Sequence, residues 1–141
     1  MQNLKRLLLA LVAFFVLTGN AIAGNVEIYI SISKQKMYVI SEQGEYEFLV
    51  STARSPYKTP LGTYKPTIVK KMHYSSQYNN APMPYSIFFN RGIAIHGTRA
   101  VHKLGKKASH GCVRLRIEEA KIVYDIVRKN GKENTTIMVI Q

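Results

Sequence analysis

The chain has 141 residues, of which 20 are lysine or arginine and 8 are acidic, and its formal charge is +12 at pH 7. It contains a single cysteine, which excludes an internal disulfide scaffold and leaves the thiol for intermolecular pairing or for chemistry. The positive charge favours polyanionic partners or is simply a solvated surface, and nucleic acid is not expected because no aromatic-basic binding motif is present.

The N-terminus has the pattern of an export signal. Lys5 and Arg6 precede an apolar run at residues 7–17, and small residues then end in Ala21-Ile22-Ala23. A positive region, a short apolar region and an A-x-A cleavage site are typical of a secretory signal peptide. The apolar run is shorter than the ~20 residues that span a bilayer. We expect residues 1–23 to be a signal peptide and residues 24–141 to be one exported domain without stable membrane insertion; the alternative is an uncleaved anchor.

Three runs with alternating apolar and polar residues open the exported domain. They occupy residues 26–32, 36–40 and 45–52, and short polar turns separate them. Alternation over runs of this length, with β-branched and aromatic residues, predicts strands. Gly44 can supply a positive φ in the second turn. We therefore expect an antiparallel meander.

The middle of the chain combines loop and strand patterns. Residues 53–66 contain three prolines, so we expect a loop broken by a short strand at residues 62–64. The polar, tyrosine-rich stretch that follows is expected to form a long exposed loop. Residues 85–90 and 92–97 are short apolar runs on either side of a turn, and they predict a hairpin that ends at His96.

The C-terminal part predicts one helix and one strand. In residues 117–131, apolar residues recur at helical spacing and form one stripe. Glu118 and Glu119 suit the N-terminal end of a helix, and Gly131 suits its end. Arg116 is a poor N-cap, so the start is less well marked. Residues 135–140 predict a final strand.

The cysteine lies in a sequence that indicates a working thiol. It forms the run Ser109-His110-Gly111-Cys112, and His96 stands before a basic loop that can fold back. A thiol is mostly protonated at neutral pH, and a nearby imidazole can take its proton. Pairing with a histidine can lower the pKa of a cysteine to ~3.5–7.5, and Arg114 would assist as a cation.

Glycines beside the two reactive residues suit this chemistry. Gly111 would allow its own N–H group and that of Cys112 to point at an oxyanion, where each donor can contribute ~3 kcal/mol. The carbonyl group of Gly97 could hold one ring nitrogen of His96 and so set its tautomer.

Two other interpretations of these residues remain open. An isolated cysteine is often a small buried hydrophobic residue, which would make Cys112 structural. A zinc site from His96, His102, His110 and Cys112 is conceivable, but the spacing H-x5-H-x7-H-x-C matches no compact ligand pattern, so no metal is expected. His73 and His102 are expected to be surface residues.

The motif resembles the catalytic signature of the L,D-transpeptidases, the family with a YkuD-like domain. In that signature a histidine is followed by a loop and then by Ser/Thr-His-Gly-Cys, an aliphatic residue, and Arg or Asn. Here these positions are His96, the run 109–112, Val113 and Arg114. The stretches 33–52, 59–66 (with its Thr-Pro-x-Gly turn) and 81–97 also resemble the family, so nearly all of the exported domain is covered.

The resemblance implies a fold and roles for the residues of the site. The fold would be a mostly-β, YkuD-like β-sandwich with one main helix after the cysteine motif. Cys112 would be the acylated nucleophile and His96 the base. Gly97 would orient His96, and the backbone of His110 and Gly111 would support the oxyanion site. Ser109 and Arg114 would support the loop or bind substrate.

The implied reaction is acyl transfer on peptidoglycan, without a metal or organic cofactor. Cys112 would form an acyl-enzyme on a tetrapeptide stem with loss of D-alanine. An amine would then take the acyl group, giving a 3-3 cross-link or a link between the wall and a wall-anchored acceptor protein. The implied location is the periplasm or cell wall, beyond the inner membrane, with a role in wall organisation and cell shape, and the thiol is expected to react with carbapenems.

Three questions stay open at the level of sequence. Water could replace the amine, which would make the protein an L,D-carboxypeptidase or another hydrolase. A non-catalytic, cationic wall-binding protein would share the charge but would not need the thiol. The basic loop residues Arg99, Lys103, Lys106 and Lys107 either recognise stem carboxylates or are only solvated.

Overall fold

The computed structural model describes residues 24–141, so the expected signal peptide lies outside the described residues. No helix in this part of the chain combines the length and apolar character needed to cross a membrane. The elements, with η denoting a 3₁₀-helix, are β1 (Val26–Ser31), β2 (Lys36–Ser41), β3 (Gly44–Leu49), β4 (Gly62–Tyr64), β5 (Ile68–Ser75), β6 (Ala81–Asn90), β7 (Ile93–Thr98), η1 (Val101–Lys103), β8 (Val113–Arg116), α2 (Ile117–Asn130), η2 (Lys132–Asn134) and β9 (Thr135–Ile140).

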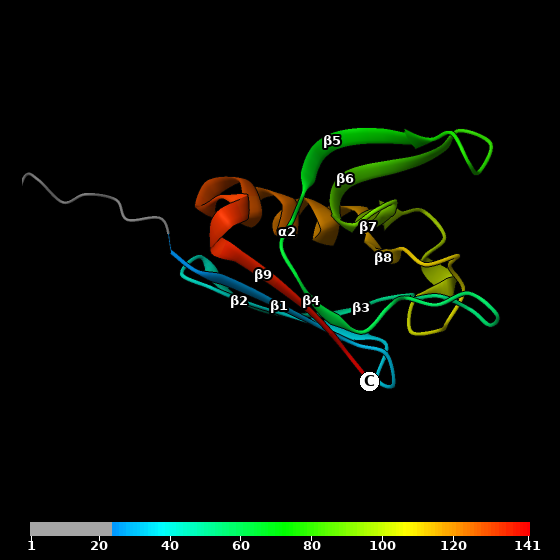
Figure 1. The fold of residues 1–141 in the computed structure, drawn as a ribbon, viewed down its shortest axis with the longest axis horizontal. Coiled ribbons are helices and arrows are strands. Elements are labelled where there is room, and N and C mark those ends of the chain that lie inside the picture. Colours follow the sequence, from blue (N-terminus) through cyan, green and yellow to red (C-terminus); the bar gives the residue numbers. More distant parts are fainter. Residues whose placement is uncertain (1–23) are drawn as a thin grey trace, which may run out of the picture.

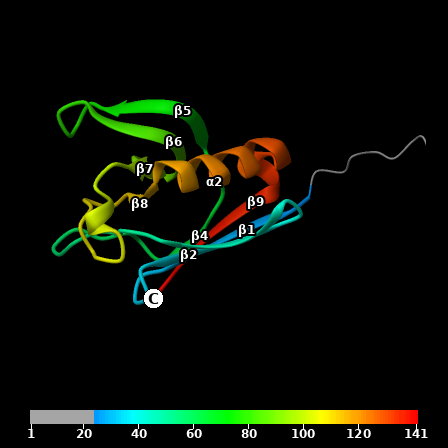
Figure 2. The same cartoon turned by 180° about the vertical axis from the view of Figure 1, so that it is seen from behind.

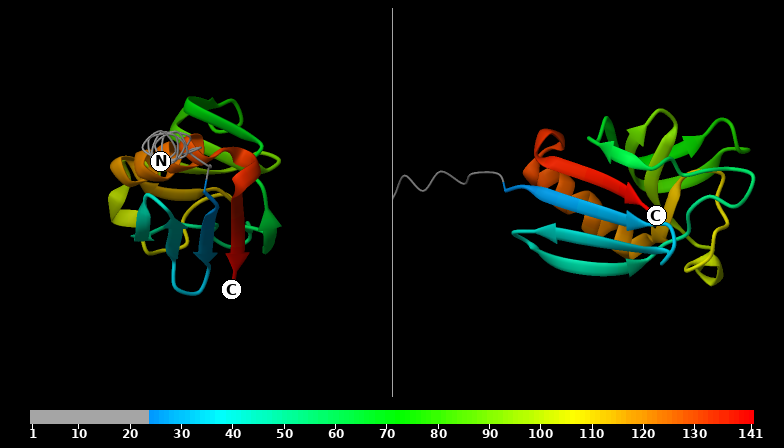
Figure 3. Two further views of the ribbon diagram at one scale, coloured as in Figure 1. Left: turned by 90° about the vertical axis from the view of Figure 1, so that its left-hand side faces the viewer. Right: turned by 60° about the horizontal axis from the view of Figure 1, so that its bottom comes forward.

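Two sheets and one long helix form the domain, as the mostly-β expectation required. The first sheet has the order β3-β2-β1-β9-β4 and the second the order β5-β6-β7-β8. Helix α2 runs between them (Figures 1 and 2). The first sheet is seen broadside in the right-hand view of Figure 3, where β9 lies beside β1.

The expected meander is confirmed, and it supplies one wall of the core. Strand β1 pairs antiparallel with β2, and β2 pairs antiparallel with β3. Alternate residues of β1, such as Ile28 and Ile30, are fully buried, which is the result of a period of two on a half-buried strand. The helix contributes its predicted stripe, including Val123 and Val127, to the same core cluster.

The expectation of a long exposed loop before residue 85 is wrong. Strands β5 and β6 form an antiparallel hairpin that pairs Ile68 with Phe88 at one end and Ser75 with Ala81 at the other. The segment was misassigned because most residues of β5 are exposed and its alternation is weak. Prolines at 82 and 84 are tolerated in β6 because β7 pairs with β6 only from Ile87 onward, so that edge is open.

The parallel pair of β7 and β8 sets the position of the site. The expected hairpin of β6 and β7 is confirmed, although β7 continues two residues past His96. His96 lies opposite Arg114 in β8. Helix α2 follows β8 directly at Ile117, with no side-chain cap from Arg116, and Gly131 ends it at a φ of 95°.

Gly97 lies at a close contact between β7 and α2. A β-carbon at position 97 would lie 2.9 Å from Ile117 Cα and 3.3 Å from Pro84 Cγ. Backbone cannot move aside as a flexible side chain can, so this position admits only glycine without a local shift. At Gly92, by contrast, a β-carbon would meet no atom within 4 Å.

We expect Gly97→Ala to lower the free energy of unfolding by about 1–3 kcal/mol, because overpacking forces β7 and α2 apart. Gly92→Ala is the matched control, and it is expected to change stability by less than about 1 kcal/mol. Urea unfolding followed by circular dichroism measures both. Equal stability of the two variants would contradict the close contact at Gly97.

Candidate active site

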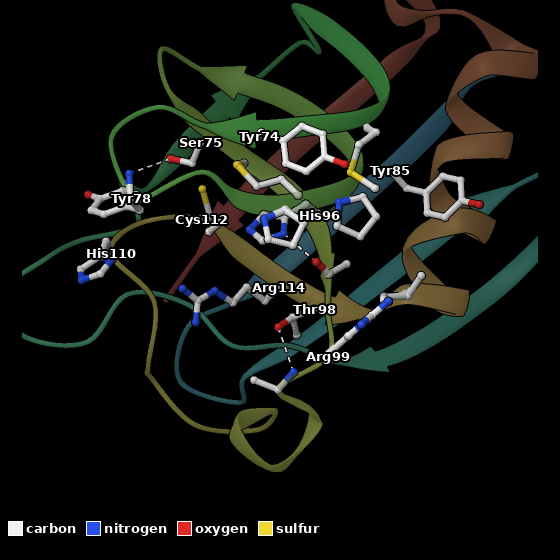
Figure 4. A pocket seen from close by; sticks show the side chains of 18 of the residues that line it. Tyr74, Ser75, Tyr78, Tyr85, His96, Thr98, Arg99, His110, Cys112 and Arg114 are labelled. Atoms are coloured by element: carbon white, nitrogen blue, oxygen red, sulfur yellow. Dashed lines mark hydrogen bonds between the residues drawn. The ribbon is translucent and has the colours of Figure 1, made fainter.

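A pocket of about 1160 Å³ opens beside β7 and β8. The β5–β6 hairpin, the segment before β8 and the start of α2 complete its wall (Figure 4). Six of the seven site residues expected from the sequence line this pocket, namely His96, Gly97, His110, Gly111, Cys112 and Arg114. The seventh, Ser109, does not.

Strand register brings the cysteine and the histidine to the same face. Ile95 pairs with Val113, and both are fully buried in the core. Because successive side chains of a strand alternate between faces, their neighbours His96, Cys112 and Arg114 face the other way, into the pocket. Figure 4 shows these three side chains in one cavity.

The His96 ring is buried and held by its neighbour's backbone. Its Nδ1 atom lies 2.8 Å from the carbonyl oxygen of Gly97. A carbonyl oxygen only accepts, so Nδ1 carries the hydrogen and Nε2 keeps the free lone pair. Burial lowers the pKa of His96 to about 4, despite the contact with Gly97 that favours the charged form. The ring is therefore neutral near pH 7 and can accept a proton at Nε2.

The Cys112 thiol is partly exposed in the pocket rather than sealed in the core. Its sulfur lies 3.9 Å from the carbonyl oxygen of Gly92. Burial raises the pKa of the thiol, and a hydrogen bond from the Ala94 backbone and the charge of Arg114 oppose that rise only in part. The lowered pKa that the sequence suggested is therefore wrong for this structure, because desolvation outweighs the nearby cation.

Both reactive groups are thus neutral at pH 7. The hydrogen bonds of residues 24–141 include none between the sulfur of Cys112 and the ring of His96. Contacts of this kind are often long before substrate binds and shorten in the reacting complex. The arrangement suits a base that removes the thiol proton during attack, rather than a thiolate formed in advance.

Ser109 supports the loop that carries the cysteine. It is fully buried, and its hydroxyl donates to the carbonyl oxygen of Cys112 at 2.6 Å and accepts from the N–H group of Gly111 at 3.0 Å. Of the two roles expected for Ser109, this geometry favours loop support over substrate contact. The same bond occupies the Gly111 N–H group in this structure, so the N–H groups of His110 and Cys112 are the candidates left for the expected oxyanion site.

Thr59 is a supporting residue that the sequence analysis did not single out. Its hydroxyl donates to the carbonyl oxygen of Gly111 at 2.7 Å and accepts from the N–H group of Ala53 at 3.1 Å. It belongs to the Thr-Pro-x-Gly turn, so the motif was visible in the sequence. Because Thr59 is far from Cys112 in the sequence, the motif alone does not show that the two segments are in contact.

An aromatic cluster surrounds His110 at the edge of the pocket. Tyr78 stacks on its ring at 4.4 Å between centroids, and Tyr57 packs edge-on at 4.7 Å. Arg54 lies 2.8 Å from His110 Nε2, and as a guanidinium it must be the donor. Desolvation and the charges of Arg54 and Arg114 lower the pKa of His110. Tyr78 lies in the β5–β6 turn, and the only sequence signal for this cluster was the density of tyrosines.

Neither of the other two histidines lines the pocket. His102 is exposed in η1, and His73 packs edge-on against Phe88 at 5.1 Å between ring centroids. Within residues 24–141 no three histidine, cysteine or acidic side chains form a group that could hold a metal ion. His102 does not line the pocket, so the four-residue zinc set considered from the sequence is not assembled.

The sequence profile of the YkuD family, described as the L,D-transpeptidase catalytic domain, matches residues 25–139. The probable L,D-transpeptidase YbiS of Escherichia coli K12 is 36% identical over 78 residues, which are 46% of this chain and 25% of YbiS. The probable L,D-transpeptidase ErfK/SrfK of the same organism is 32% identical over 89 residues, which are 55% of this chain and 28% of that protein. The matched segments thus span about a quarter of these relatives.

Solved structures share the fold at low sequence identity. An L,D-transpeptidase from Mycobacterium smegmatis superposes with a TM-score of 0.72 at 17% identity, covering 83% of this chain and 59% of that one. The L,D-transpeptidase LdtMt1 in complex with imipenem superposes with a TM-score of 0.71 at 18% identity, covering 82% and 58%. Because the family profile extends over nearly the whole described domain, the chain belongs to the L,D-transpeptidase (YkuD) family.

Proposed function

We propose that this protein is an exported peptidoglycan L,D-transpeptidase in which Cys112 is the nucleophile and His96 the base. The observation that carries the proposal is that both side chains face one large pocket, with the imidazole neutral and its tautomer held by Gly97. Membership of the family supports the reaction class. The export pattern of residues 1–23 supports a site of action in the periplasm or cell wall.

In the first half-reaction the sulfur of Cys112 attacks the carbonyl carbon after the third residue of a tetrapeptide stem. His96 Nε2 takes the thiol proton as the S–C bond forms, and the backbone N–H group of Cys112 stabilises the oxyanion. When the peptide bond breaks, His96 returns the proton to the departing amine of D-alanine. A thioester to Cys112 remains.

In the second half-reaction an amine of another stem, or of a wall-bound protein, attacks the thioester. His96 removes a proton from that amine, and the thiol leaves and is protonated again. The product is a 3-3 cross-link or a link between the acceptor protein and the wall. The same chemistry with water as acceptor gives the hydrolase alternative, so the acceptor decides between transferase and carboxypeptidase.

The charge of the pocket supports a substrate that carries carboxylates. The charged side chains in its lining are Lys71, Arg99 and Arg114, and the lining contains no aspartate or glutamate. Stem peptides carry free carboxylates, which such a pocket would attract. The proposed steps use only side-chain and backbone groups of the protein.

Replacing the nucleophile tests the proposal directly. We expect Cys112→Ala to release D-alanine from a tetrapeptide muropeptide at least about 10³-fold more slowly than the wild type, because no acyl-enzyme can form. Coupled assay of D-alanine and chromatography of the products measure this. Unchanged release would refute the nucleophile, and free tripeptide without dimers from the wild type would favour the hydrolase.

The pH dependence of thiol reactivity tests the protonation state of the pair. Since burial raises the pKa of Cys112, we expect the rate of alkylation by iodoacetamide to rise with a midpoint above the ~8.5 of an ordinary cysteine. N-acetylcysteine, titrated in parallel, is the control. A midpoint below pH 7 would instead indicate a thiolate–imidazolium pair and contradict the neutral arrangement.

A carbapenem should acylate the same sulfur. One of the superposed structures is a complex with imipenem, and the pocket around Cys112 is open enough to admit a ligand. We expect the intact mass of the wild type to increase by one imipenem adduct and that of Cys112→Ala to stay constant. An unmodified wild type, or an equally modified variant, would count against Cys112 as the acylated residue.

A further inference from the structure

Acidic side chains are confined to two segments of the chain. All 8 acidic residues lie within residues 27–47 and 118–133. Residues 48–117 contain no acidic residue but hold twelve of the 20 lysines and arginines, and every residue that lines the pocket belongs to this segment. The lining of the pocket therefore includes Lys71, Arg99 and Arg114 but no carboxylate.

Other positive side chains form a cationic ridge next to the pocket. We use this name for the exposed side chains of Arg54, Lys103, Lys106 and Lys107. The segments that carry them, the loop after β3 and the η1 loop before β8, lie at the same end of the molecule as the tip of the β5–β6 hairpin (Figures 1 and 3). The β2–β3 turn, with Glu42 and Glu45, lies at the opposite end.

Backbone hydrogen bonds hold the ridge in place. The N–H group of Gly105 donates to Val50 at 2.8 Å, and that of Ala108 donates to Thr52 at 2.9 Å. The hydroxyl of Ser51 donates to the carbonyl oxygen of Lys106 at 2.6 Å. The backbone of the loop that carries the three lysines is thus anchored to the segment at residues 50–52.

No carboxylate of the described domain neutralises the ridge. The ion pairs in residues 24–141 are Lys36 with Glu47 and Lys121 with Asp125, and neither includes a ridge residue. The guanidinium of Arg54 contacts His110, which lines the pocket, so the ridge is continuous with the pocket edge. Like charges repel one another, and an anionic ligand would relieve that repulsion.

We propose that the cationic ridge binds carboxylates of the peptidoglycan polymer on either side of the reacting stem, and so holds the pocket against the wall. The inference rests on the proposed function, because it places the reacting stem in the pocket. A polymer offers many carboxylates at once, whereas one soluble muropeptide occupies the pocket alone. The acidic residues at the far end favour the same orientation, since that end is attracted less.

Binding is tested with the inactive Cys112→Ala protein, so that no reaction intervenes. The probe is purified peptidoglycan sacculi stripped of accessory anionic polymers, and bound protein is measured by sedimentation. In this Cys112→Ala background we expect the triple change Lys103→Gln/Lys106→Gln/Lys107→Gln to weaken binding at least about fivefold, and added salt to weaken binding of the protein with an unchanged ridge. The control Lys34→Gln/Lys129→Gln/Lys132→Gln removes the same charge elsewhere and should stay within about twofold.

Turnover of the active proteins then separates the two proposals. We expect the ridge triple variant to turn over a soluble tetrapeptide muropeptide at the wild-type rate and to lose activity on sacculi. Equal loss of binding in both triples, salt-independent binding, or lost turnover of the soluble substrate would overturn the ridge. The ridge proposal would also be overturned if the ridge triple variant bound sacculi normally and lost binding only to vesicles of anionic phospholipid. A wild type without activity on either substrate would refute the proposed function, while the sedimentation result would still decide the ridge.

Discussion

The pairing of β7 with β8 is the constraint on which the site depends. These strands are parallel, so a connection of some length must join them, and residues 99–112 provide it. Their register buries Ile95 and Val113 in the core and thereby turns His96 and Cys112 toward the pocket. A slip of one residue would exchange the two faces, and the reactive side chains would enter the core.

Burial gives the reactive pair its chemical character. The same desolvation lowers the pKa of His96 and raises that of Cys112, so both groups favour their neutral forms. The positive charge of Arg114 lowers both pKa values. It therefore adds to the effect of burial on His96 and opposes the effect of burial on Cys112. In the proposed reaction the proton can then move at the moment of attack, so no reactive thiolate has to be kept in the open pocket beforehand.

The sequence predicted the parts of the fold whose periodicity is strong. The alternation in β1 to β3, the stripe of α2 and its glycine stop all have local causes, and they were assigned correctly. The β5–β6 hairpin was not predicted because the apolar-polar alternation of these two strands is weak. The prolines in β6 also argued against a strand there. A segment with a weak strand pattern can still form a strand when a neighbouring strand pairs with it, and a single sequence does not show which strands pair.

The candidate site was predictable in its reactive residues but not in their support. His96 and Cys112 stand in a recognisable motif, whereas the contact from Thr59 to Gly111 and the stack of Tyr78 on His110 join segments far apart in the chain. The direction of the Cys112 pKa was also missed. Cations nearby in sequence suggested a lowered value, but burial is a property of the folded pocket.

Gly97 performs two tasks at one position: its carbonyl oxygen holds the imidazole, and its missing side chain admits the backbone of Ile117. The position of helix α2 and the tautomer of His96 therefore both depend on this one residue. Substitutions in the turn of the β5–β6 hairpin and in the basic loop can change the edge of the pocket without disturbing these contacts, whereas Gly97, Ile117 and Pro84 of β6 pack too closely to vary freely. Diversity in such a lineage should accumulate at the rim of the cavity and be scarce at its floor.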